Sequence, residues 1–295
     1  MKIFITGGTG FIGGAVVQRL HRAGHQLLVL VPGHRSVSIP KSRTQLLRGS
    51  LAQLNRLAPA ISQFRPVVTI HLAWEGIPDF SVSMSAKNLV YSTRLIELVS
   101  QIKCPLFIGV GSCWEYGATQ GRLSENLVPR PTNAFTAAKL SVQMFGEQVA
   151  QMSGTKFVWA RLFYVYGPHQ KPTSLIPSAI QATERGQVLP LKTPNAGNDF
   201  IYVDDVAEAI VQIVKRRASI KSGVYNVGSG KLWGVKQVMD LILRHFGIPG
   251  DKLAALPRPI GFYADTRKLT QATGWRPRTS LRQGIRQTIN WYKSQ

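Results

Sequence analysis

A glycine-rich turn near residue 10 constrains this chain more than any other feature. Gly7, Gly10 and Gly13 follow a short apolar run in the spacing G-x-x-G-x-x-G and lead into a segment with helical spacing. In this setting the first glycine permits a positive φ, the second lets the backbone approach a pyrophosphate, and the third lets helix and strand pack closely. Free N–H groups at the helix start, around Phe11 and Ile12, would face the phosphates. The sequence therefore predicts a dinucleotide site.

The end of the next apolar run, residues 26–31, bears on which dinucleotide is bound. An NAD site usually has Asp or Glu there, which accepts hydrogen bonds from the adenosine ribose. This chain instead continues with Pro32, Gly33, His34, Arg35 and Ser36. His34, Arg35 and Ser36 suit a 2′-phosphate, because a guanidinium can bind it in a bidentate way. We predict NADP as the first choice and NAD as the second; the alternative is that Arg35 is an ordinary solvated cation.

Composition favours one large α/β unit in a reducing compartment. The chain has 295 residues, 44% of them hydrophobic, which is enough for a large core. No apolar run reaches the length needed to cross a bilayer, and a signal peptide is not expected before a strand that begins at Lys2. Cys104 and Cys113 are too few for a disulfide scaffold and wrongly spaced for zinc. We expect a cytoplasmic protein with no bound metal and no membrane partner.

The positive charge is unusual, with 36 Lys and Arg against 14 Asp and Glu, a net charge of +22. Such an excess attracts phosphates on nucleotides, nucleic acids or membranes. The cations are nevertheless spread along the chain, and no zinc-finger or RNP-like segment accompanies them. A general surface bias is the favoured interpretation, while steering of anionic substrates and nucleic-acid binding stay open.

Alternating strand-like and helix-like segments predict a doubly wound parallel sheet of the Rossmann type. Two motifs lie where such a sheet would place ligands, outside the carboxyl ends of its strands. Ser112 follows a strong apolar strand at residues 106–110. Further along, Pro131 with Thr132 or Asn133 indicates a helix start, after which Phe135 and Lys139 stand four residues apart on one helical face.

These motifs together resemble the extended short-chain dehydrogenase/reductase family, which comprises nucleotide-sugar epimerases, dehydratases and reductases. The resemblance covers nearly the whole chain. In order, the motifs are T-G-G-T-G-F-I-G at Thr6, H-L-A at His71, G-S-x-x-x-Y-G at Gly111, P-T-x-x-F-x-x-x-K at Pro131, R-L-F-Y-V-Y-G-P at Arg161, D-F-I-Y-V-D-D-V at Asp199, Y-N-V-G-S-G at Tyr225 and G-W-R-P at Gly274.

The resemblance implies hydride transfer between a nicotinamide and a sugar carbon, with a tyrosine as proton donor or acceptor. Ser112 would hydrogen-bond the reacting oxygen and Lys139 would hold the nicotinamide ribose, but the tyrosine position is Phe135. Three explanations stay open: natural loss of activity, another donor (Tyr164, Tyr116 or a water held by Ser112), or an engineered Tyr-to-Phe change. The remaining cofactor positions that the resemblance implies are Ser50, Leu51, Leu72, Ala73 and Phe163.

On the substrate side the resemblance implies contacts from Trp74, Tyr164, Asn198 and Arg258, although Tyr164 and Asn198 replace the usual Asn and Arg. We expect a dinucleotide-binding domain over residues 1–165 plus about 200–225, and a smaller mixed α/β substrate lobe over 166–199 and 226–295. The predicted activity is reduction or epimerisation of a nucleotide-linked 4-keto-6-deoxy sugar by a homodimer. The alternative is a non-catalytic NADP-binding or RNA-binding member of the family.

Overall fold

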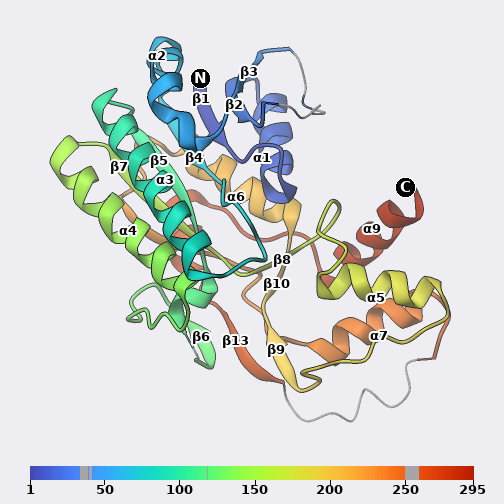
Figure 1. Cartoon of the computed structure of the whole chain (residues 1–295). Coiled ribbons are helices and arrows are strands. Elements are labelled where there is room, and N and C mark those ends of the chain that lie inside the picture. Colours follow the sequence, from blue (N-terminus) through green and yellow to red (C-terminus); the bar gives the residue numbers. More distant parts are fainter. Residues whose placement is uncertain (34–38, 40–41, 118, 250–258) are drawn as a thin grey trace.

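A seven-stranded parallel sheet forms the centre of the computed structural model, which describes residues 1–33, 39, 42–117, 119–249 and 259–295 (Figure 1). The strand order is β3-β2-β1-β4-β5-β7-β11, and neighbouring strands are parallel throughout. The strands are β1 (Lys2–Thr6), β2 (Gln26–Val31), β3 (Thr44–Arg48), β4 (Val68–His71), β5 (Leu106–Ser112), β7 (Lys156–Leu162) and β11 (Gly223–Val227). The inner strands are almost continuously apolar because helices cover both faces. The predicted Rossmann fold is confirmed.

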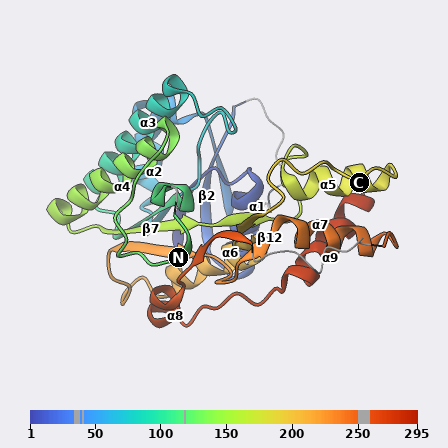
Figure 2. The same cartoon turned by 90° about the horizontal axis from the view of Figure 1, so that it is seen from below.

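Two layers of helices enclose this sheet (Figures 1 and 2). One apolar core joins the sheet to α1 (Phe11–Arg22), α6 (Val203–Lys215) and α8 (Arg267–Thr273). A second core, on the other face, joins it to α2 (Leu54–Phe64), α3 (Val82–Gln101) and α4 (Ala134–Ser153). The sheet order reverses next to β1, so the chain leaves β1 and β4 toward opposite faces of the sheet, and such a switch point is where sheets of this kind bind ligands.

A smaller mixed α/β part lies beside one edge of this sandwich. Helices α5 (Leu175–Glu184), α7 (Val235–His245) and α9 (Leu281–Lys293) share an apolar cluster of their own. A four-stranded sheet has the order β12-β9-β13-β6, antiparallel at β12–β9 and parallel elsewhere, and β8 pairs with β10. These strands are β6 (Gly121–Leu123), β8 (Tyr164–Tyr166), β9 (Ala196–Asn198), β10 (Phe200–Tyr202), β12 (Trp233–Gly234) and β13 (Ile260–Ala264).

The division into two domains at the stated boundaries stays a prediction. Strand β6 comes from the segment assigned to the dinucleotide-binding domain, yet it extends the smaller sheet. Within the described ranges, no helix is both long and apolar enough to cross a membrane.

Candidate active site

The turn after β1 requires glycine at two positions because a side chain there would clash with the protein's own backbone. Gly7 has a φ of +74°, and a Cβ on it would lie 2.5 Å from the backbone nitrogen of Ala73. A Cβ on Gly13 would lie 2.0 Å from the carbonyl oxygen of Gly7. At Gly10 the corresponding distance to that oxygen is 3.3 Å, so the protein alone constrains Gly10 less. This is what we expect of a position whose close approach is to a ligand.

Helix α1 begins directly at this turn with its N–H groups unopposed. Gly10 is its N-cap residue, no side chain caps it, and its first turn, which contains Phe11 and Ile12, has no acidic residue. The first N–H groups of a helix lack partners within the helix and carry partial positive charge. A hollow of about 770 Å³ opens beside Gly10 and Phe11 and reaches Asp204 at the start of α6. The turn therefore fits a dinucleotide pyrophosphate.

The other predicted cofactor residues lie near carboxyl ends of the central strands. Leu72 and Ala73 follow β4, Ser50 and Leu51 follow β3 at the short 3₁₀ helix η1 (Leu51–Gln53), and Phe163 follows β7. The topology thus brings them to the edge of the sheet where the glycine turn lies. His34, Arg35 and Ser36, on which the NADP preference rests, and Arg258 lie outside the described residues.

Ser112, the last residue of β5, is positioned by a buried ion pair. Its backbone N–H donates to Oε1 of Glu115 at 2.7 Å, and Oε2 of Glu115 accepts from Nε of Arg161 at 2.7 Å. Both charged side chains are almost inaccessible, at 0% and 1% exposed. The carboxylate also accepts from the indole N–H of Trp159, and Arg161 donates to Gln143 at 2.8 Å. These bonds fix the strand end on which the Ser112 hydroxyl sits.

Lys139 lies in the interior with its ammonium group between a carbonyl and an aromatic face. Asn133 caps α4, so Phe135 and Lys139 fall on successive turns of the same face. The Lys139 Nζ donates to the Val110 carbonyl at 2.7 Å and lies 4.0 Å from the centre of the Trp74 ring. Burial lowers its pKa to about 7, partly offset by the charge of Glu115.

Phe135 is surrounded by other aromatic rings. It is 6% exposed, and its ring centre lies 5.4 Å from that of Trp74, 5.0 Å from that of Phe80 and 6.3 Å from that of Trp114. We call Trp74, Phe80, Trp114 and Phe135 the aromatic cluster. Because it contains no hydroxyl, the position that should carry the catalytic proton is apolar.

The two tyrosines considered as replacement donors differ in how their hydroxyls are used. The Tyr116 hydroxyl donates to the buried side chain of Asn226 at 2.8 Å. The Tyr164 hydroxyl instead accepts from the indole N–H of Trp114 at 3.0 Å, which leaves its own proton available. Burial raises the Tyr164 pKa to about 12, so the phenol stays protonated at neutral pH. Of the two tyrosines, only Tyr164 has a hydroxyl proton that is not donated to a described residue.

His71, from the H-L-A motif, and Asn198, a predicted substrate contact, lie on different strands. His71 bonds Thr6 at 2.7 Å and Ser92 at 2.9 Å through its two ring nitrogens, and burial lowers its pKa to about 3. It is therefore a neutral, hydrogen-bonded residue of the interior. Asn198 lies in β9 opposite Trp233 of β12. Among the described residues no group of His, Cys, Asp and Glu could hold a metal ion, and both cysteines are buried thiols.

Sequence reasoning missed Glu115, Arg161, Phe80 and Trp114 as parts of this site. A charged residue within an apolar strand, as in Phe157-Val158-Trp159-Ala160-Arg161-Leu162, is a signal that could have identified Arg161. Its partner Glu115 is 46 residues away and is brought near by the register of β5 against β7, in which Gly111 faces Arg161. No comparable signal exists for Phe80.

Comparison with known proteins shows the family to which this chain belongs. The family described as "NAD dependent epimerase/dehydratase family" matches residues 3–228. The chain belongs to this family. Among curated relatives, it is 28% identical to an Arabidopsis thaliana trifunctional UDP-glucose 4,6-dehydratase/UDP-4-keto-6-deoxy-D-glucose 3,5-epimerase/UDP-4-keto-L-rhamnose-reductase, over 99% of this chain and 47% of that protein. This chain thus spans about half of that plant relative.

Two further relatives of this epimerase/dehydratase family match along most of their length. The dTDP-L-rhamnose 4-epimerase of Burkholderia thailandensis is 25% identical over 98% of this chain and 94% of that protein. The solved structure of MoeE5 in complex with UDP-glucose and NAD is 26% identical, with a TM-score of 0.85 over 100% of this chain and 99% of that one. The resemblance to the extended short-chain dehydrogenase/reductases is therefore confirmed.

Proposed function

We propose that this chain is an NAD(P)-dependent reductase of a nucleotide-linked 4-keto-6-deoxy sugar, in which Tyr164 takes over proton donation from the position occupied by Phe135. One observation carries this proposal: Phe135 lacks a hydroxyl, whereas the Tyr164 hydroxyl accepts from Trp114 and donates its own proton to no described residue. The glycine turn, Ser112 and Lys139, on which the predicted hydride transfer depends, support it. The relatives named for UDP-4-keto-L-rhamnose reduction and dTDP-L-rhamnose epimerisation support the substrate class.

The dinucleotide, when bound, supplies the hydride; the protein's residues hold the sugar and deliver the proton. The Ser112 hydroxyl polarises the keto oxygen, and the Glu115–Arg161 pair keeps its backbone fixed. Lys139 binds the nicotinamide ribose. Tyr164 is protonated throughout the neutral range and can donate to the alkoxide that hydride transfer creates, although its raised pKa makes it a weaker acid than an ordinary tyrosine. The phenolate that would act as a base in oxidation is scarce at neutral pH. This favours reduction over epimerisation.

The cofactor preference is part of the same proposal. NADP is our first choice because no carboxylate follows β2, and NAD, which MoeE5 holds, is the second. Dissociation constants for NADPH and NADH, measured by fluorescence titration, test this choice. Tighter binding of NADPH, reversed by Arg35→Asp, is the expected result, whereas tighter binding of NADH by the native chain would contradict it.

Oxidation of NADPH with a panel of UDP- and dTDP-linked 4-keto-6-deoxyhexoses tests the activity. We expect turnover with at least one member, abolished by Ser112→Ala and Lys139→Met in chains that still fold. Binding of NADPH without turnover on any member would instead identify a non-catalytic family member. The enclosed, hydroxyl-free surroundings of Phe135 are the observation that favours this second candidate.

A homodimer in the cytoplasm remains our expectation for the assembled protein. Sedimentation velocity of the purified chain tests the dimer.

A further inference from the structure

The C-terminal segment carries a concentration of positive charge that the candidate active site does not use. Residues 266–295 contain no Asp or Glu. They contain seven basic residues, Arg267, Lys268, Arg276, Arg278, Arg282, Arg286 and Lys293. An exposed segment of one sign attracts anions, but a specific site also needs a shaped surface and groups that recognise something other than charge.

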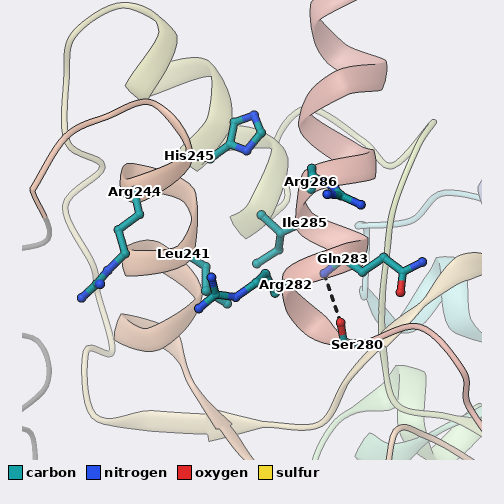
Figure 3. A pocket seen from close by; sticks show the side chains of 8 residues that line it. All are labelled: Leu241, Arg244, His245, Ser280, Arg282, Gln283, Ile285 and Arg286. Carbon is teal, nitrogen blue, oxygen red and sulfur yellow. Dashed lines mark hydrogen bonds between the residues drawn. The ribbon is translucent and has the colours of Figure 1, made fainter.

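A groove between α7 and α9 provides such a surface. One hollow of about 430 Å³ is lined by Arg244, His245, Arg282 and Arg286 (Figure 3). A second, of about 420 Å³, is lined by residues that include Trp233, Gln237 and Asp240. Both hollows share the lining residues Leu241, Ser280 and Arg282, so we treat them as one feature, the α7–α9 groove. None of these lining residues belongs to the predicted cofactor or substrate positions.

The basic end of the groove has more positive charge than its neighbours neutralise. Arg244 donates to Oδ2 of Asp240 at 2.8 Å, but Arg282 and Arg286 form no ion pair with any described residue. They stand four residues apart on α9, a spacing at which like charges repel. Burial lowers the pKa of His245, and the charges of Lys293 and Arg286 lower it further. A bound anion would relieve this repulsion.

The other end of the groove offers groups that suit a heteroaromatic ring. Oδ1 of Asp240 is buried and accepts no hydrogen bond within the described part of the chain. The side chain as a whole is 18% exposed. An unsatisfied buried acceptor is unfavourable, and a ligand N–H would satisfy it. The half-buried Trp233 ring lines the same hollow and can stack on a planar base.

We propose that the α7–α9 groove is a second binding site, specific for a nucleoside phosphate. Arg282 and Arg286 hold the phosphate; Trp233 and the unbonded oxygen of Asp240 hold the base. A free nucleotide and the 5′-phosphorylated end of a single strand share this chemistry. The inference does not depend on the proposed reductase activity, because it uses none of the same residues.

Isothermal titration of the full chain, saturated with NADPH, tests the site with AMP, UMP and inorganic phosphate as probes. We expect AMP or UMP to bind at least about tenfold more tightly than phosphate. Arg282→Gln/Arg286→Gln should weaken nucleotide binding at least about tenfold. The matched control Arg276→Gln/Arg278→Gln removes the same charge from exposed positions outside the groove. It should change the nucleotide affinity less than about twofold. Trp233→Leu should reduce nucleotide affinity toward that of phosphate.

Equal losses of nucleotide affinity in the two double variants would mean that diffuse surface charge attracts the nucleotide, and this would overturn the proposal. Equal affinity for phosphate and for nucleotides would overturn it as well. A 5′-phosphorylated tetranucleotide distinguishes the sources: affinity more than tenfold above that of AMP identifies a strand, and equal affinity identifies a free nucleotide. Thermal melting confirms that each variant folds. Turnover of the nucleotide sugar should be unchanged by Arg282→Gln/Arg286→Gln. The titration therefore tests the groove and turnover tests the reductase, so that either proposal can fail without the other.

Discussion

Two regions meet at the end of β5, and they differ in polarity. Behind Ser112 the Glu115–Arg161 network is charged, buried and largely hydrogen-bonded. In front, the aromatic cluster around Phe135 is apolar and has no hydroxyl. The network that holds the backbone of Ser112 is thus in place, while the position at which the family resemblance implies a tyrosine carries only a phenyl ring. The difference teaches that the buried polar network behind Ser112 does not depend on a hydroxyl at position 135.

Breaking the polar region should have the largest effect on stability. Glu115→Ala leaves the Arg161 guanidinium buried without its counter-charge, so we expect the free energy of unfolding to fall by about 3–5 kcal/mol in urea denaturation. Glu75→Ala, which removes a partly exposed pair with Lys87, should cost about 0–1 kcal/mol. Similar decreases in the free energy of unfolding for the two variants would show that the Glu115–Arg161 pair contributes no more to stability than a surface pair.

Lys139 lies between the two regions, and its titration should make the free energy of unfolding depend on pH. Its pKa of about 7 in the folded chain lies below the unfolded value near 10.4, so between these pH values the unfolded chain binds more protons. The free energy of unfolding should therefore rise with pH over this window, by up to about 1.4 kcal/mol per pH unit. Lys139→Met should abolish that part of the slope in apo protein. An unchanged slope would mean that Lys139 stays charged when buried.

Tyr116→Phe sharpens the contrast between the two tyrosines. Removing the bond to Asn226 should cost about 1–2 kcal/mol of stability and leave turnover within about twofold. The measurement is the free energy of unfolding together with kcat. A large loss of kcat without loss of stability would make Tyr116 the donor and displace Tyr164 from that role.

The sequence predicted those parts of the molecule that depend on local spacing. Strand, glycine turn and helix are consecutive, so Gly7 and Gly13 could be placed without a structure, and the four-residue interval from Phe135 to Lys139 fixed their common face. Contacts set by the register of distant strands could not be predicted. The pairing of Glu115 with Arg161 and the bond from Trp114 to Tyr164 join residues 46 and 50 apart. Neither follows from periodicity.

A double-mutant cycle at positions 135 and 164 tests the central claim most directly. The measurement is kcat for NADPH oxidation with the nucleotide sugar that the panel identifies, in the native chain, Tyr164→Phe, Phe135→Tyr and the double variant. In the native chain, Tyr164→Phe should lower kcat by about 10²–10⁴-fold; with tyrosine restored at 135, the same change should cost little. If Tyr164→Phe leaves native turnover unchanged, Tyr164 is not the donor and the account is wrong.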